Sequence, residues 1–437
     1  MSFDQAVALA VLIAVVGALI WGRFRSDAVA LAGAAALVGA GVVRPAEIQS
    51  AFASPALIAL ASLFVIAYAM ELSGLIGALI RHAVRLCRVF GAAGLWIVIV
   101  LCGAASAFLN NTPIVVIASP VVRDVAHSLG LSPRRFLIPL SYATVLGGCC
   151  TLIGTSTNLL VNDMARNAGQ PTFGVFEITP VALALAAVGG LYLLLFGGAI
   201  LGRDDPAPMR SKAIAAAEAA QTSDVALGDV SLFAAADRPL DTGRALISLG
   251  VFVGVVAVAA LGYAPIASSA FTGAVLLVVL RVIRPEEAYK GLRPDILLLI
   301  AGMVVVGLAL QLSGLADRAT ASMLQLVQGL GPCTALALLY GVTLVLTEAL
   351  SNAAVAVLMT PVAVALADSL SVSPKPFLAA VMLAASAAFA TPFGYQTNVL
   401  VYQMGGYRYF DFVRIGLPLN LLTWATAMAA LPATFPF

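Results

Sequence analysis

The chain has 437 residues, of which 62% are hydrophobic and only 10% charged, and its mean hydropathy is +1.04. A soluble domain usually carries about 25% charged residues, so this composition excludes a soluble globular protein and indicates a surface that faces lipid. The five cysteines are odd in number and form no CxxC pair, which argues against a disulfide framework or a zinc site. The net charge of +2 gives no reason to expect a nucleic-acid partner.

Ten apolar segments are predicted to cross the bilayer, since about 20 residues of helix span its hydrocarbon core. They cover residues 5–22, 27–43, 55–74, 133–166, 176–201, 243–263, 267–283, 295–313, 375–404 and 412–431. No basic region precedes the first of them and no small-residue cleavage site follows it, so we expect a retained span and not a signal peptide. The predicted fold class is all-α and polytopic.

Two further apolar blocks, 91–126 and 331–368, are interrupted near the middle by polar residues. Each half of a block is short for a crossing, so we predict two re-entrant hairpins. Irregular backbone is tolerated at membrane depth where protein or a water-filled cavity covers it. With both blocks as hairpins, 19 of the 23 Lys and Arg residues fall on one side of the membrane. Cytoplasmic loops are enriched in Lys and Arg, so we assign this side to the cytoplasm. Both termini are then predicted on the outer side of a plasma (inner) membrane.

The chain repeats itself at a spacing of 240 to 241 residues. Residues 109–140 aligned with 350–381 give 12 identities in 32 positions, and 151–161 aligned with 391–401 give 6 in 11. We therefore predict two inverted repeats, 1–202 and 243–437, each of five transmembrane helices plus one hairpin, joined by a cytoplasmic linker at 203–242. An odd number of crossings per repeat turns the second repeat over, so that matching residues meet near the midplane, as in many secondary transporters.

The hairpin tips are the predicted substrate site. At each tip one short helix ends and another begins, which offers unpaired backbone N–H groups and the positive end of a helix dipole to an anion. Asn, Ser and Thr act there both as helix caps and as neutral ligands. The predicted substrate-binding residues are Asn110, Asn111, Thr112, Ser351, Asn352 and Ala353.

Two companion breaks interrupt the long segments 133–166 and 375–404. Glycines permit the helix to unwind there, and a proline in the second break removes a backbone donor. Unwound carbonyls together with Thr and Asn oxygens form a cage that suits Na⁺, since a hard cation prefers several oxygen ligands. The predicted Na⁺-binding residues are Gly154, Thr155, Ser156, Thr157, Asn158, Thr391, Gly394, Thr397 and Asn398.

Paired tips with an Asn, each followed by a Gly-x-x-Thr-Asn break, resemble the divalent anion:sodium symporter family and, more broadly, the ion transporter superfamily. The resemblance covers nearly the whole chain. It implies a homodimer in which a transport domain moves against a scaffold as an elevator. The family's tips read Ser-Asn-Thr, whereas this chain has Asn110-Asn111-Thr112 and Ser351-Asn352-Ala353. These variants look more like the sulfate-carrying branch, so sulfate is favoured as cargo and a dicarboxylate is the alternative.

Other functions remain open at this point. Glu348 is the only acid that we place well inside an apolar block, and an intramembrane acid is a functional candidate. It would serve as the coupling acid of a proton-coupled carrier or exporter. An intramembrane enzyme would need a buried nucleophile with a base, and no His or Lys is placed deeply enough. A passive channel is less consistent with two symmetric broken-helix sites. We expect a transporter with no cofactor beyond Na⁺ as coupling ion.

Overall fold

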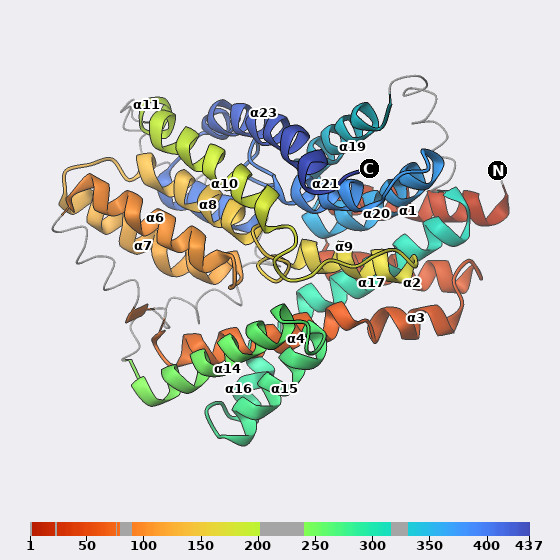
Figure 1. Ribbon diagram of the computed structural model, residues 1–437, viewed down its shortest axis with the longest axis horizontal. Coiled ribbons are helices and arrows are strands. Elements are labelled where there is room, and N and C mark those ends of the chain that lie inside the picture. Colours follow the sequence, from red (N-terminus) through yellow and green to blue (C-terminus); the bar gives the residue numbers. More distant parts are fainter. Residues whose placement is uncertain (1, 22–23, 76, 79–89, 202–239, 316–330) are drawn as a thin grey trace.

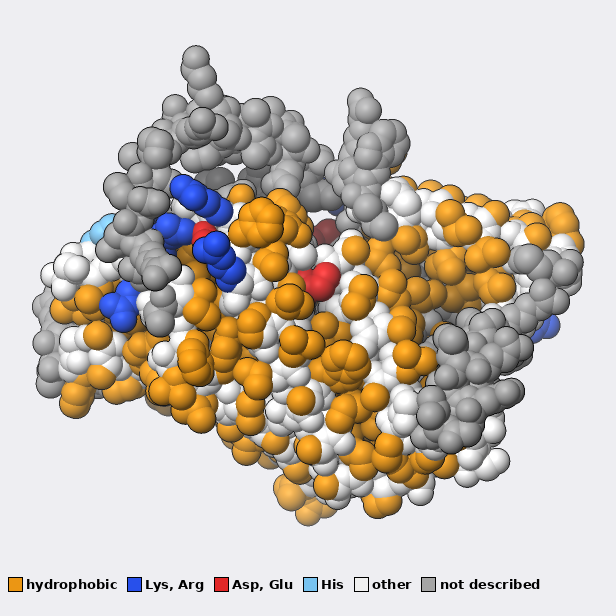
Figure 2. Space-filling view, turned by 90° about the horizontal axis from the view of Figure 1, so that it is seen from above, with side chains coloured by type: hydrophobic (Ala, Val, Ile, Leu, Met, Phe, Trp, Pro, Cys, Tyr) orange, Lys and Arg blue, Asp and Glu red, His pale blue; other side chains and the backbone are white. Residues whose placement is uncertain are grey.

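The computed structural model describes residues 2–21, 24–75, 77–78, 90–201, 240–315 and 331–437. In these ranges every regular element is a helix (Figure 1). Six of the described helices are long and apolar enough to cross a membrane: Pro45–Leu72, Thr179–Gly197, Thr242–Ala260, Pro294–Leu312, Asn352–Ser369 and Tyr409–Thr434. Much of the surface is hydrophobic (Figure 2), as lipid contact requires. The predicted linker lies almost wholly outside the described residues.

The helices follow the same order in the two halves of the chain. The first half contains α1 (Phe3–Trp21), α2 (Ser26–Gly39), α3 (Pro45–Phe52), α4 (Pro55–Leu72), α6 (Ala92–Ser106), α7 (Asn111–Ser128), α8 (Arg134–Gly148), α9 (Ser156–Asn167), α10 (Thr179–Tyr192), the π-helical turn η1 (Leu193–Gly197) and α11 (Gly198–Leu201). The second contains α14 (Thr242–Ala260), α15 (Ile266–Val279), α16 (Pro285–Gly291), α17 (Pro294–Leu312), α19 (Gly331–Thr347), α20 (Asn352–Ser369), α21 (Lys375–Ser386), α22 (Gln396–Gly405) and α23 (Tyr409–Thr434). Each predicted span therefore contains helix, and the two longest contain two helices each.

The two long segments are each divided in two at the predicted break. Residues 149–155 separate α8 from α9, and residues 387–395 separate α21 from α22. The hairpin blocks likewise consist of two helices each, α6 with α7 and α19 with α20, joined at the polar tips. Because α20 is itself long and apolar enough to cross a membrane, the re-entrant course of the hairpins remains a prediction.

The sequence reading missed two short helices, α3 and α16, which directly precede α4 and α17. Both follow an arginine and begin with a proline, which suits the first helical turn. In α3, Glu47 accepts a hydrogen bond from the backbone N–H of Arg44 at 2.6 Å, and in α16, Glu287 accepts one from Arg284 at 3.0 Å. The signal was present as Arg-Pro-x-Glu, repeated 240 residues apart, but it is too short for a span.

Helix packing is reciprocal between the halves. α2 packs against α17, and their counterparts α15 and α4 pack against each other. α7 packs against α22 while α20 packs against α9, and α10 packs against α23. A two-fold relation between the halves would produce this pattern, although their inverted orientation in the membrane remains a prediction. Close approach depends on small residues: a Cβ at Gly302 would lie 2.7 Å from the carbonyl carbon of Ala30.

Candidate functional site

Each tip asparagine is tied to the end of the helix that precedes it. In the first tip, Ser106 Oγ donates a hydrogen bond to Asn111 Oδ1, and the Asn110 side chain caps α7 by accepting from Thr112 N at 3.2 Å. In the second tip, Thr347 Oγ1 donates to Asn352 Oδ1 at 3.0 Å, and Ser351 caps α20 by accepting from Ala354 N at 3.3 Å. The structure thus gives the paired tips the same local geometry.

Each break is hydrogen-bonded to the tip of its own half. In the first break, Thr151 Oγ1 donates to Ala107 O, Gly154 N donates to Thr151 Oγ1 at 3.1 Å, and Asn158 Nδ2 donates to Thr151 O at 3.0 Å.

The second break repeats these three bonds. Thr391 Oγ1 donates to Glu348 O at 3.1 Å, Gly394 N donates to Thr391 Oγ1 at 3.1 Å, and Asn398 Nδ2 donates to Thr391 O at 3.3 Å. The Thr and Asn of each break therefore fix the unwound backbone against the tip.

The first tip also meets the second break. Asn111 Nδ2 donates to Tyr395 OH at 2.9 Å, and Thr112 Oγ1 donates to Gln396 Oε1 at 3.3 Å. Among the described residues no hydrogen bond joins one tip directly to the other. The predicted convergence of the two tips in one pocket therefore remains a prediction, with Tyr395 and Gln396 as the observed link between the halves.

The predicted Na⁺ ligands lie in an oxygen-rich, mostly buried environment. Thr157, Asn158, Thr397 and Asn398 are almost completely buried. At Gly154, a Cβ would lie 2.7 Å from Ala107 O, 2.9 Å from Ser106 O and closer still to Gly148 O. Three backbone carbonyls of the first tip and break thus crowd one point. Asn158 Oδ1 is buried and has no hydrogen-bond partner. Neutral oxygens of this kind fit a hard monovalent cation.

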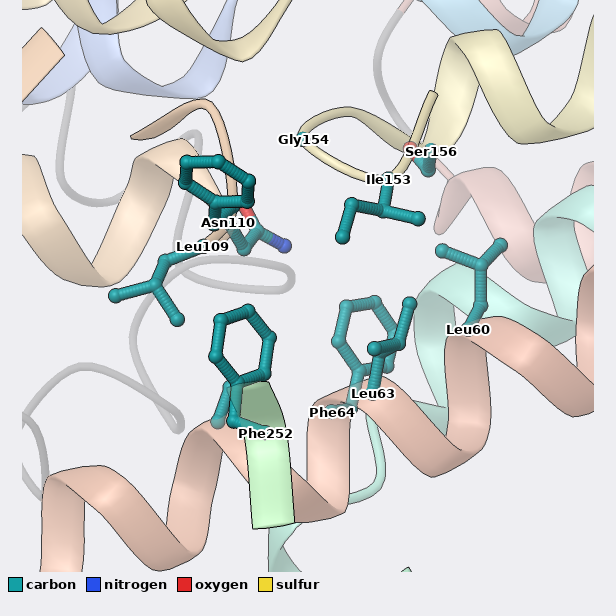
Figure 3. Close-up of a pocket in the computed structure, with 11 residues that line it drawn as sticks. Leu60, Leu63, Phe64, Leu109, Asn110, Ile153, Gly154, Ser156 and Phe252 are labelled. Atoms are coloured by element: carbon teal, nitrogen blue, oxygen red, sulfur yellow. The ribbon is translucent and has the colours of Figure 1, made fainter. Parts of the chain in front are cut away.

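A cleft opens between the first tip and break on one side and α4 and α14 on the other (Figure 3). Its walls include Asn110, Gly154 and Ser156, three of the predicted site residues, which face apolar side chains of the two helices. The apolar and aromatic lining is contributed by Leu60, Leu63, Phe64, Phe108, Leu109, Ile153 and Phe252. The cleft places the first tip at a boundary between two groups of helices.

Glu348, the predicted coupling acid, connects the second tip to the second break and to α23. Its Oε1 accepts hydrogen bonds from Ala390 N at 2.8 Å and from Asn420 Nδ2 at 2.7 Å. Its Oε2 is buried without a hydrogen-bond partner. The matched position in the first half is Ala107, so this carboxylate has no counterpart there. Ala353 is half-buried in the first turn of α20 and offers no polar side-chain group.

Three buried polar residues near the site were not predicted from the sequence. Ser141 Oγ in α8 donates to Asn398 Oδ1 at 2.8 Å and lies 2.7 Å from Thr397 Oγ1, and Asn420 in α23 donates to Glu348. Asp163 in α9 is also a buried acid, 2% exposed, which the sequence prediction did not name. Asp163 lies in the predicted span 133–166, where neighbouring polar residues hid it. No sequence pattern pairs Ser141 or Asn420 with partners so distant in the chain.

The tips and breaks contain no basic residue. In the part of the chain that the structure describes, no Lys, Arg or His side chain donates a hydrogen bond to a tip or break residue, and no group of three or more His, Cys, Asp or Glu residues could hold a metal ion. The site therefore offers backbone, hydroxyl and amide groups, with Glu348 as its formal charge.

Known proteins resemble this chain along most of its length. It is 26% identical to an uncharacterized transporter of Synechocystis, with 92% of each chain covered, and 25% identical to the uncharacterized transporter YfbS of Escherichia coli, with 95% of this chain and 97% of that one covered. A probable sodium/sulfate cotransporter of Chlamydomonas reinhardtii is 43% identical over 97 residues, which is 21% of this chain and 11% of that one.

Solved structures agree on the fold. The Neisseria gonorrhoeae protein MtrF superposes with a TM-score of 0.57 at 15% identity, covering 88% of this chain and 82% of that one. A family model described as a citrate transporter, CitMHS, matches residues 16–372. The prediction of a membrane transporter rather than an enzyme is confirmed, and the chain belongs to the citrate transporter (CitMHS) family, within the ion transporter superfamily.

Proposed function

We propose that this transporter carries a small divalent anion, sulfate before a dicarboxylate, together with Na⁺. The observation that carries the proposal is that the tips and breaks contain no basic side chain. A dianion buried among neutral groups is very costly unless charge compensates it. Because no basic side chain of the described residues bonds to this region, a cation that binds with the anion supplies the compensation.

The anion would bind where α7 and α20 begin. Helix N-termini favour negative charge, and the tips present two of them with asparagines at their first turns. The Asn352 side chain is 8% exposed, and its Nδ2 has no hydrogen-bond partner. It is therefore a donor ready for an anionic oxygen. Sulfate is favoured because relatives over about a fifth of the chain are named sodium/sulfate cotransporters.

The Na⁺ ions would bind at the two breaks. The crowded carbonyls around Gly154 and the unpartnered Oδ1 of Asn158 supply oxygen ligands without a full negative charge. Coulomb attraction between the bound cation and the bound anion would then link the two affinities reciprocally. The resemblance to the divalent anion:sodium symporters adds the remaining parts of the proposal: a homodimer in the plasma membrane that works as an elevator.

A second candidate is proton-coupled transport through Glu348. The observation that favours it is the buried Oε2 without a partner, which could carry a proton in place of a bound cation. In this case a single carboxylate of the second half would couple the anion to protons, and the break residues would serve only to position it.

Uptake by proteoliposomes distinguishes the candidates. We expect radiolabelled sulfate to accumulate faster than succinate and only when Na⁺ is present outside, with a sigmoidal dependence on Na⁺. Thr157→Ala and Asn398→Ala should shift the Na⁺ dependence more than the sulfate dependence, whereas the matched control Thr272→Ala, an exposed threonine of α15, should change neither. Uptake that ignores Na⁺ and collapses with a protonophore would replace the Na⁺ proposal with proton coupling.

A further inference from the structure

Tyr395 lies at the start of a helix, where a residue with a short polar side chain is usually preferred. It is the N-cap residue of α22, and its side chain makes no capping hydrogen bond. Its counterpart 240 residues earlier is Thr155, the N-cap of α9, which does cap the helix by accepting from Thr157 N at 3.4 Å. Ser, Thr, Asp and Asn are the preferred capping residues at this position, and Tyr is not. Residues that break a local preference without a local gain are expected at functional sites.

The Tyr395 side chain is directed across to the other half of the chain. Its hydroxyl accepts a hydrogen bond from Asn111 Nδ2 at 2.9 Å, and Thr155 of the first break lies beside the same hydroxyl. Asn111 itself is 2% exposed and its Oδ1 already accepts from Ser106. Tyr395 therefore engages the Nδ2 donor group of the first tip amide and places its side chain next to that amide.

The second half has no equivalent of this contact. The counterpart of Asn111 is Asn352, whose Oδ1 accepts from Thr347 while its Nδ2 is left without a partner. The counterpart of Tyr395 is Thr155, a side chain too short to reach across as the tyrosine does. The two matched tip amides therefore differ in their donors: Asn111 Nδ2 donates to Tyr395, and Asn352 Nδ2 has no partner.

We propose that Tyr395 sets the size of the anion that the site accepts. This inference rests on the proposed function, that the tips bind a divalent anion. Two open tip amides could each hold one end of an extended dicarboxylate. With Tyr395 engaging Asn111, Asn352 is the open one of the two matched tip amides, and a single open amide suits a compact dianion whose charge is concentrated at one point. Tyr395 is thus the specificity-determining residue against long dicarboxylates.

The test is the ratio of two anions in the full-length protein in proteoliposomes, at one fixed Na⁺ concentration. Tyr395→Thr gives the second break the same residue as Thr155 in the first break. Tyr395→Phe removes the hydroxyl but keeps the ring. We expect Tyr395→Thr to make succinate at least tenfold more potent as an inhibitor of sulfate uptake. Tyr395→Phe frees the Asn111 donor but keeps the ring beside it, so it should raise the potency of succinate less than Tyr395→Thr does.

Tyr340→Phe is the control, because Tyr340 is a buried tyrosine whose hydroxyl has no hydrogen-bond partner; it should change neither anion. The inference is overturned if Tyr395→Thr shifts sulfate and succinate equally. If Tyr395→Thr does not fold, dicarboxylates of increasing length, from malonate to glutarate, are tested as inhibitors of sulfate uptake by the wild type. Inhibition should fall as the chain lengthens. Equal inhibition by all lengths would overturn the inference. Because only ratios between anions are compared, failure here is separable from failure of Na⁺ coupling.

Discussion

Gly154 shows how a single residue sets the geometry of the first break. Backbone oxygens of Ser106, Ala107 and Gly148 approach the position that a Cβ would occupy. Backbone atoms cannot move aside as a flexible side chain can, so any larger residue forces the tip and the break apart. Glycine here is needed for close approach, and the sequence predicted it correctly as part of the break, although the reason given was unwinding.

Gly154→Ala should therefore reduce transport severely. Overpacking of a tight site costs typically about 1–3 kcal/mol, and here the displacement falls on the carbonyls proposed to bind Na⁺. We expect at least a tenfold loss of uptake rate and a higher Na⁺ requirement, measured in proteoliposomes. The control is Gly254→Ala in α14, where a Cβ meets no atom within 4 Å, and it should behave as the wild type. Normal Na⁺ affinity in Gly154→Ala would argue against a cation at this break.

The two tip asparagines should respond differently to truncation. Asn111 has partners for both side-chain atoms, Ser106 and Tyr395, whereas Asn352 has a partner for its Oδ1 alone. Losing a hydrogen bond to a charged ligand costs roughly 1.5–3 kcal/mol. Asn352→Ala should accordingly raise the sulfate KM about tenfold or more with little change in thermal stability.

Asn111→Ala should instead lower the melting temperature, because it leaves the buried hydroxyl of Ser106 without its partner. Thermal unfolding in detergent, combined with uptake kinetics, separates the two effects. Equal effects of both variants on KM and on stability would contradict the asymmetry between the tips.

At the scale of elements, the sequence predicted the breaks and tips well and the contacts between them poorly. Hydrophobic runs of about 20 residues, and the Asn, Gly and Thr that interrupt them, identify helices and their ends because the bilayer makes irregular polar backbone costly. The partners of those residues come from other helices. Ser141 is 257 residues from Asn398, and Asn420 is 72 residues from Glu348. Only the packed structure brings them together.

Glu348 connects the end of α19 to the second break and to α23 through hydrogen bonds. Substitutions of Glu348 test whether its carboxylate has a structural role or couples transport to protons. Glu348→Gln keeps an oxygen that can accept from Ala390 N and Asn420 Nδ2, whereas Glu348→Ala leaves both donors unpaired. An unsatisfied buried donor costs about 1–3 kcal/mol. Under Na⁺ coupling we expect Glu348→Gln to retain Na⁺-dependent uptake and Glu348→Ala to lose most of it.

The measurement is sulfate uptake against Na⁺ and against external pH for both variants. If Glu348→Gln abolishes uptake while the protein remains folded, and wild-type uptake follows pH and not Na⁺, the carboxylate is the coupling group. Asn420→Ala serves as the companion variant, since it removes one partner of Glu348 without changing the charge.

At the scale of the whole molecule, α2 packs against α17 and α4 packs against α15, while the inverted repeat inferred from 12 identities in 32 positions stays a prediction. Sequence identity could show which residues match, but it could not show which helices touch. The cleft is such a feature: it lies where Leu109 and Asn110 of the first tip face Phe252 of α14 and Leu63 of α4 (Figure 3). Its walls come from segments that are far apart in the chain.

If the tips and breaks move as one body against α4 and α14, this cleft is the sliding surface. A covalent link across it should then stop transport. In a chain whose five native cysteines are replaced by alanine, Leu109→Cys with Phe252→Cys joins the two sides, and we expect a short cleavable cross-linker to abolish sulfate uptake and a reductant to restore it. The matched pair is Val255→Cys with Gly273→Cys, because the Val255 side chain faces Gly273 between α14 and α15, on one side of the cleft. That link should leave uptake intact. Undiminished uptake by fully cross-linked Leu109→Cys, Phe252→Cys protein would show that the two sides keep their relative position during transport, and the elevator proposal would fail.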